Sequence, residues 1–469
     1  MSETKLIKNA IGLKEGLMQG VAGAAPAGAA VATLTGAASF ALGALPLTAM
    51  IAFFVVMLNG YIISRISLKV SGAGGYYEYV KNGHGPSIGL LTGLIYIFYQ
   101  IMAIAFMALS IGVFVPATLS YVFNINIPII FTTPLIIVAL AYGFIISIAG
   151  IKISTRYTMV MAIVEILTVT IMGLYIILSH PSLNNADVFT LKYSSSGITG
   201  VVMGVLLMYT AFAGFGASTP LGEESRQPKQ IISKSIIASI LILGVFFVFS
   251  AYVFTVAYGP DRMSGYAQSL VPGITIIGGY MGIGAAVVIT ILFINSLLTG
   301  LVVMVNGTSR VLMTMGRDAV LPSKLSKVHN KFKTPFLSAA AVTLTSALIA
   351  IAGNFLLGGF TAFIMTAIGA TLGTLFVHII INSSYPSINK RFNGNYDFKS
   401  ILLSLISIII FIFILGSTFV SISQPVIIGS LAFIIWTLVS LGIIYKKRGK
   451  LTEIKIERST EIGTETTTK

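Results

Sequence analysis

Long apolar runs dominate the pattern of hydrophobic and polar positions along this chain. Many exceed the roughly 20 residues that a helix needs to cross the hydrocarbon core of a bilayer. They are continuous rather than alternating, which favours helices over a barrel, the only other structure that satisfies all backbone polar groups in lipid. We therefore predict an all-α integral membrane protein with about twelve transmembrane helices.

The predicted spans form two sets of six. The first set lies near residues 16–38, 44–65, 87–120, 128–149, 157–179 and 198–221. The second set lies near residues 232–258, 276–309, 336–354, 359–382, 400–421 and 425–445. No polar stretch between them is long enough to fold as a separate catalytic domain.

Composition supports this class of protein. Of the 469 residues, 56% are hydrophobic and only 9% are charged, whereas a typical soluble domain is about 25% charged. Cysteine is absent, which excludes disulfides, thiolate nucleophiles and cysteine-ligated metals. The four histidines are scattered without metal-ligand spacing, so we predict neither a metal site nor a cofactor.

The net charge of +15 raises the possibility of nucleic-acid binding, but its distribution indicates membrane topology instead. All but two of the 29 lysines and arginines fall in segments on one side of the predicted spans, the exceptions being Lys192 and Arg262. Basic residues are retained on the cytoplasmic side of a membrane. We predict a multi-pass plasma-membrane protein with a cytoplasmic N-terminus (1–15) and a disordered cytoplasmic tail (446–469).

Two predicted spans are interrupted at mid-membrane depth. The first contains Gly23, Pro26 and Gly28, and the sixth contains Gly214 and Gly216. Proline and glycine break helices, and bare backbone is tolerated in a bilayer only inside protein or beside a water-filled cavity. Such a pair indicates the binding site of a solute transporter. Close helix packing through small residues is the alternative.

The exposed backbone of such breaks suits a zwitterion. Free N–H groups at the N-terminus of a half-helix favour a carboxylate, and free carbonyls at a half-helix C-terminus favour an ammonium group. A small-molecule substrate, the lipid bilayer and a coupling ion are thus the predicted partners, and no nucleic acid. The oligomeric state stays open.

Four cytoplasmic motifs identify a resemblance. They lie at residues 71–79 (SGAGGYYEY), 150–154 (GIKIS), 222–231 (GEESRQPKQI) and 309–335, which begins SRV and ends TP. In this order they resemble motifs of the amino acid–polyamine–organocation superfamily of permeases, over residues 12 to 445. Ser71 stands where that family usually has proline.

The resemblance implies a fold and a site. Two five-helix inverted repeats, at 16–179 and 198–382, would flank an external loop at 180–197, and two further helices would occupy 400–445. The substrate would bind between broken helices 1 and 6. Its carboxylate would meet N–H groups near Gly23, Ala24, Ala25 and Pro26. Its amino group would meet carbonyls near Phe212, Ala213 and Gly214, with Phe212 or Phe215 helping to close the site.

The sequence departs from the family where substrates are selected. Gly216 replaces an acidic residue of some members, and 24–27 reads Ala-Ala-Pro-Ala where many have Gly-x-Gly-Ile-Phe. Without an acid there, neutral or apolar amino acids are the favoured substrates. Polyamines and cationic amino acids are the alternatives.

Several polar residues are candidates for ion coupling. Glu165 is a carboxylate well inside span five, where it could carry a proton or brace neighbouring helices. Asn295, Ser296 and Thr299 follow one another along span eight, where hydroxyls could bind Na⁺ or merely bond other helices. We favour proton coupling, with sodium symport or exchange as alternatives. His378 reads as a packed or hydrogen-bonded residue.

The predicted function is thus a secondary active transporter that works by alternating access. A channel would show rings of charge or a filter sequence, and an enzyme would need a cluster of catalytic side chains in the membrane; neither pattern is present in the sequence. Glu223 and Glu224 end span six beside Arg226 and Lys229. There they could form an ion pair that stabilises a gate, or remain solvated.

Overall fold

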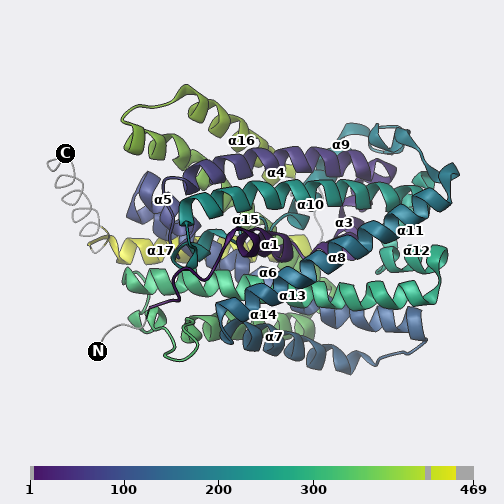
Figure 1. Ribbon diagram of the computed structural model, residues 1–469, viewed down its shortest axis with the longest axis horizontal. Helices are drawn as coiled ribbons and strands as arrows, with labels where there is room; N and C mark the ends of the chain where they lie inside the picture. Colours follow the sequence, from purple (N-terminus) through teal and green to yellow (C-terminus); the bar gives the residue numbers. More distant parts are fainter. Residues whose placement is uncertain (1–4, 418–423, 450, 452–469) are drawn as a thin grey trace.

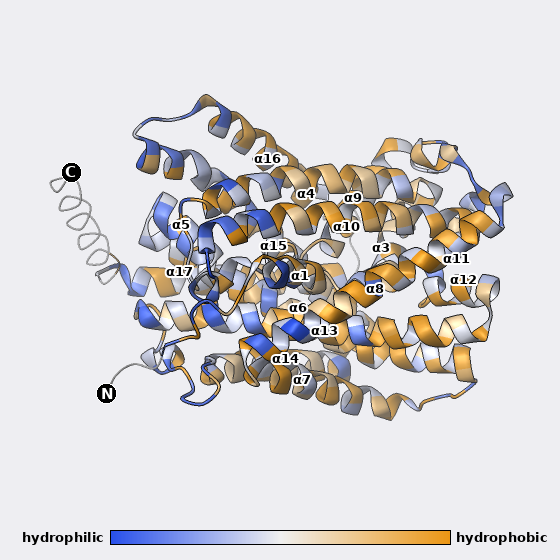
Figure 2. Cartoon of the chain, in the orientation of Figure 1, coloured by the Kyte–Doolittle hydropathy of each residue, from blue (hydrophilic) through white to orange (hydrophobic). Residues whose placement is uncertain are grey.

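The computed structural model describes residues 5–417, 424–449 and 451. This part of the chain is helical and contains a single isolated β-bridge, between Ile11 and Ser225. The long helices run side by side along the longest axis of the molecule (Figure 1). Hydrophobic residues cover their central lengths, and hydrophilic residues gather toward the two ends (Figure 2). An all-α membrane protein is confirmed.

Ten apolar stretches among the described residues are long enough to span a bilayer, and the shorter apolar α9 (Gly197–Ala211) adds to them. The first stretch contains both a broken helix and α4 (Leu45–Ser67). The others that agree with predicted spans are α6 (Pro86–Phe123), α7 (Thr132–Ile148), α8 (Ile151–Ser179), α10 (Pro228–Tyr258), α14 (Phe336–Leu357), α15 (Gly359–Asn393), α16 (Phe398–Ser417) and α17 (Gln424–Lys446).

The predicted span at 276–309 is wrong in its outline. The chain forms a short α12 (Pro272–Met281) and then the long α13 (Ile283–Arg317). Gly282 lies between them with φ of +81°, a conformation that glycine adopts without steric cost. The apolar run continues across this break, so hydropathy alone could not reveal it.

A second element was absent from the sequence prediction. The motif at 71–79 leads into α5 (Tyr76–His84), a short amphipathic helix between α4 and α6. Tyr76, Tyr77 and Tyr79 on α5 are buried. In Figure 1 α5 lies at the same end of the molecule as the end of α17, opposite α11 (Met263–Gln268) and α12.

The helices differ in how deeply they are buried. α6, α13 and α15 bury most of their apolar windows within the protein, whereas α16 and α17 leave most of theirs exposed. Exposed apolar side chains at such helices face lipid in a membrane protein. The grouping into repeats at 16–179 and 198–382 stays a prediction, and most of the predicted tail at 446–469 lies outside the described residues.

Candidate functional site

The first helix is broken where the sequence predicts it. α1 (Leu13–Gly23) stops before Ala25, which has φ of +47°, and α2 (Pro26–Gly28) begins at the following proline. A proline disfavours the α conformation of the residue before it, and an alanine in the left-handed region costs about 1 kcal/mol. A π-type turn at residues 29–33 then leads into α3 (Leu34–Ala41).

The N–H groups at this break are only partly free. Ala24 donates to the carbonyl of Val21 at 3.1 Å and Ala25 donates to that of Ala22 at 3.0 Å. The N–H of Ala27, at the start of α2, donates to Oε2 of Glu165 over a long 3.5 Å. A substrate carboxylate here would share or replace these bonds.

The sixth helix unwinds after Ala211 into a succession of tight turns. Phe212 donates to Tyr209, Ala213 to Thr210, and Phe215 to Phe212, all backbone bonds of 3.0–3.1 Å. Among the described residues, no hydrogen-bond donor reaches the carbonyls of Ala211 or Ala213. Both residues line the central cavity, and their carbonyls are available to an ammonium group.

The two breaks cross backbone to backbone. A Cβ placed on Gly214 would lie 2.0 Å from the carbonyl carbon of Gly23, far inside van der Waals contact. A Cβ on Gly216 would lie 1.8 Å from the hydroxyl oxygen of Tyr76. Position 214 therefore requires glycine for steric reasons. At position 216 the Tyr76 side chain occupies the space that a Cβ would need.

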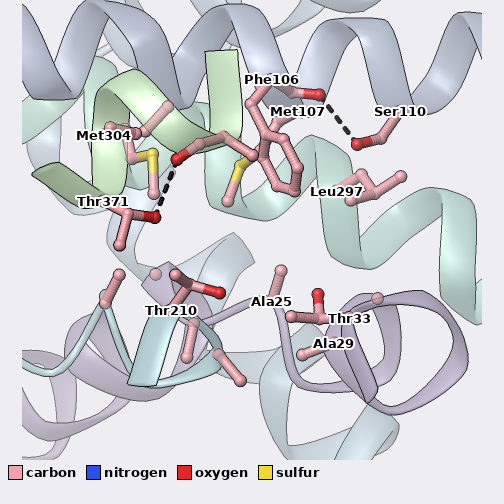
Figure 3. A pocket seen from close by; sticks show the side chains of 18 of the residues that line it. Ala25, Ala29, Thr33, Phe106, Met107, Ser110, Thr210, Leu297, Met304 and Thr371 are labelled. Atoms are coloured by element: carbon pink, nitrogen blue, oxygen red, sulfur yellow. Dashed lines mark hydrogen bonds between the residues drawn. The ribbon is translucent and has the colours of Figure 1, made fainter. Parts of the chain in front are cut away.

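A cavity of about 90 Å³ lies between the broken helices, α6, α13 and α15. Figure 3 shows that its walls are mostly apolar, with Ala25 and Ala29 lying across from Met107 and Leu297. The hydroxyls of Ser110, Thr210 and Thr371 already donate to carbonyls of their own helices. None of the described residues that line the cavity is charged.

The structure assigns the predicted substrate residues different positions. Gly23, Ala24, Ala25 and Ala213 line this cavity, whereas Gly214 lines only a smaller adjoining space. Pro26 is buried and lines neither. Phe212 packs on Phe247, and Phe215 packs against His378; neither ring borders the cavity. Its aromatic walls come instead from Tyr99, Phe106, Tyr209, Phe293 and Phe363, which no motif distinguished from ordinary core residues.

In the part of the chain that the structure describes, the cavity continues into a larger space toward one end of the molecule. Toward α11 it adjoins a vestibule of about 470 Å³ that shares the wall residues Thr33, Phe106, Thr210 and Phe363. Toward α5 only about 20 Å³ remains, beside Tyr76 and Tyr96. The conformation is therefore closed on the α5 side.

Ion pairs bridge the elements on this closed side. Arg310 of α13 is buried and contacts the buried Glu224 through Nε and Nη2. Arg317 donates to both carboxylate oxygens of Glu223, at 2.7 and 2.9 Å. The prediction that Glu223 and Glu224 form ion pairs is confirmed. Their partners are arginines of α13 rather than the neighbouring Arg226 and Lys229, because the tertiary fold brings α13 close to this segment.

The buried Glu165 lies beside the first broken helix. Ser296 donates to its Oε2 at 2.6 Å and Asn295 donates to its Oε1 at 3.0 Å. Thr299 instead donates to the carbonyl of Ser296. Tyr157, which sequence reasoning missed, donates to Asn295. The two predicted coupling groups thus share one hydrogen-bonded cluster that links α2, α8 and α13.

A second polar network borders the cavity. The Tyr209 hydroxyl is 2.6 Å from Nδ1 of His378 and accepts from Asn59 at 2.9 Å. The prediction that His378 is hydrogen-bonded is confirmed. This network joins α4, α9 and α15 and holds Tyr209 at the cavity wall.

Comparison with known proteins identifies the family. The family model described as "Amino acid permease" matches residues 15–456. The chain belongs to the amino acid permease family. This permease is 26% identical over 387 residues to an uncharacterized transporter of Mycobacterium tuberculosis, covering 81% of the permease and 80% of that relative. The family makes it a multi-pass membrane transporter of a small molecule rather than an enzyme.

Two further relatives carry substrate names. The permease is 24% identical over 409 residues to the branched-chain amino acid permease BcaP of Bacillus subtilis, covering 83% of each chain. It is 23% identical over 362 residues to the low-affinity putrescine importer PlaP of Escherichia coli, covering 74% of the permease and 75% of the importer. The relatives thus differ in substrate.

Proposed function

We propose that this permease carries neutral, apolar α-amino acids across the plasma membrane by alternating access. The observation that carries the proposal is the central cavity, which adjoins the backbone of both broken helices and whose described walls are mostly apolar and carry no charge. The relation to a branched-chain amino acid permease supports it.

The proposed substrate orientation follows from the backbone. The carboxylate would approach the break between α1 and α2, with donors near Gly23, Ala24 and Ala25 beside Pro26. The ammonium group would bind the carbonyls of Ala211 and Ala213, near Phe212 and Gly214. The side chain would then lie against Met107, Leu297 and Met304, where burial of apolar surface contributes about 25 cal/mol per Å².

Putrescine transport is the second candidate, because one relative imports putrescine. A diamine carries two positive charges and no carboxylate. Burying an ammonium group without a counter-charge is costly, and the described walls of the cavity offer no acidic side chain. The chemistry of the cavity thus favours the amino acid.

We further propose that a proton drives transport through Glu165. A carboxylate deep in a membrane protein is costly when charged and usually faces a cavity or partner. Here its hydrogen-bond partners Ser296, Asn295 and Ala27 are all neutral. Protonation of Glu165 would therefore leave no positively charged partner without its counter-ion. Its bond to Ala27 connects its protonation to the first broken helix.

Uptake into proteoliposomes tests both proposals. A panel of labelled amino acids and putrescine is offered under an imposed proton gradient, a sodium gradient, or neither. We expect accumulation of leucine, isoleucine or valine with the proton gradient alone. Accumulation of putrescine and of no amino acid would overturn the substrate proposal. Sodium-driven uptake that disappears in Ser296→Ala/Thr299→Ala would transfer coupling to α13.

A further inference from the structure

Basic side chains gather where α4, α15 and α16 meet, away from the transport cavity. Tyr61 and Arg65 are four residues apart on α4, so they share one face, and Lys69 follows the end of that helix. The Lys69 ammonium donates to Oδ1 of Asn389 at 2.5 Å and of Asn393 at 3.1 Å. The Lys399 ammonium lies over the ring of Tyr61, 5.6 Å from its centre.

These charges lack carboxylate partners. Among the described residues, no acid forms an ion pair with Arg65, Lys69 or Lys399, whereas Lys81, Arg310 and Arg317 at the same end of the molecule each have one. The acceptors of Lys69 are neutral amides. Burial, with the nearby positive charge of Arg65, lowers the pKa of Lys69. The corner therefore concentrates positive charge that would be stabilised by an anion.

Asp397 is the acid near this corner, and it is already engaged. Its carboxylate accepts from the N–H groups of Lys399 and Ser400 at 3.2 Å each, which caps the start of α16. Its charge raises the pKa of Lys69 but less strongly than burial and Arg65 lower it. With three basic side chains against this one carboxylate, the cluster has an excess of positive charge.

Apolar surface continues directly from the basic cluster. Phe398 at the start of α16 is 76% exposed and Leu405 is 53% exposed. Phe54, two turns before Tyr61 on the same face of α4, is 63% exposed. Figure 2 shows the change from hydrophilic to hydrophobic along α16. A phosphate bound by the cluster would have lipid-facing surface beside it for attached acyl chains.

We propose that Arg65, Lys69 and Lys399 form a binding site for the phosphate headgroup of an anionic phospholipid. Basic residues between transmembrane helices at the membrane surface attract such headgroups, and arginine and lysine donate charge-assisted hydrogen bonds to phosphate oxygens. A free phosphate has the same charge but cannot use the apolar surface of α4 and α16. The lipid is therefore the preferred occupant.

The experiment compares two triple variants of the full-length protein in neutral detergent. The site variant is Arg65→Gln/Lys69→Gln/Lys399→Gln. The control is Lys324→Gln/Lys327→Gln/Lys331→Gln, which removes the same charge from exposed positions between α13 and α14. Native mass spectrometry measures retention of phosphatidylglycerol, with phosphatidylcholine and inorganic phosphate as the other probes.

We expect the site variant to bind phosphatidylglycerol at least about tenfold more weakly, since each basic residue near the surface contributes about a factor of five. The control should stay within about twofold of wild type. Equal losses in both variants, or no loss in the site variant, would overturn the proposal. Inorganic phosphate binding as tight as the lipid would overturn the choice of a lipid. Should the site variant not fold, the single substitution Lys399→Glu is compared with Lys327→Glu.

Discussion

Glu165 shows how a single residue in the sequence can mark a site without revealing its partners. A lone carboxylate in a membrane span was recognisable from hydropathy, and so were the hydroxyls of Ser296 and Thr299. That Ser296 bonds to Glu165 while Thr299 does not depends on how α8 and α13 are rotated against each other. No pattern within either helix encodes that rotation.

We predict that Glu165→Gln abolishes proton-driven accumulation but retains exchange. The amide has the shape of the carboxylic acid and can still accept from Ser296, so the cluster stays folded while its proton is lost. Gradient-driven uptake and counterflow in proteoliposomes measure the two properties separately. Uptake against a gradient at the wild-type level would contradict the proton-carrier role.

Glu78 on α5 lies outside the membrane-spanning helices and among charged neighbours. Burial, followed by the negative charge of Glu223, raises its pKa from 4.5 to about 7; Asp318 adds to this, while Lys81 and a backbone bond from Gly74 oppose it. Opening of the α5 side would hydrate Glu78 and return its pKa toward 4.5. The closed form is therefore fully favoured below about pH 4.5, and this advantage disappears as the pH rises through 7.

We predict that the closed form weakens about tenfold between pH 6 and pH 8, as expected for one proton bound with a pKa of about 7 in the closed form and 4.5 in the open form. The chain has no cysteine, so maleimide labelling of Ala217→Cys from the α5 side reports opening. Rates are divided by those of the exposed control Ser323→Cys, which removes the pH dependence of the thiol itself. When Glu78→Gln is combined with Ala217→Cys, the cysteine should label slowly at both pH values. A pH response as large as that of Ala217→Cys alone would contradict the role of Glu78.

Among the elements, the broken helices were the most predictable. Pro26 and the glycines signalled both interruptions, since proline and glycine act locally on the backbone. The break at Gly282 was missed because the surrounding run stays apolar. The helix α5 was missed because it is only nine residues long and carries Glu78 and Lys81, so hydropathy gives no signal for it. Local chemistry thus predicted where helices end better than hydropathy did.

The crossing of these two elements makes Gly214 indispensable. We predict that Gly214→Ala lowers the free energy of unfolding by about 1–3 kcal/mol, as overpacking does, and abolishes transport, because its Cβ would meet the Gly23 backbone. Gly416→Ala on α16 is the matched control, since its Cβ would meet no atom of the described residues within 4 Å. It should change stability by no more than about 1 kcal/mol.

Thermal unfolding and leucine uptake measure the two variants side by side. Stability and transport of Gly214→Ala equal to those of Gly416→Ala would show that the broken helices do not cross as closely as described.

At the scale of the whole molecule, the distribution of lysine and arginine predicts orientation. The family and the apolar helices establish a multi-pass membrane protein, and the basic end that carries α5 is proposed to be cytoplasmic. In intact cells, an impermeant maleimide should therefore label Asn184→Cys but not Ser323→Cys. Labelling of Ser323→Cys alone would reverse the orientation.

The central claim is that the cavity between the broken helices exchanges neutral, apolar amino acids between the two sides of the membrane. Counterflow tests it most directly, because it needs alternating access to a substrate site but no driving ion. Vesicles preloaded with unlabelled leucine should transiently accumulate labelled leucine, and vesicles preloaded with putrescine should not. Counterflow of putrescine, with none for leucine, isoleucine or valine, would contradict the account.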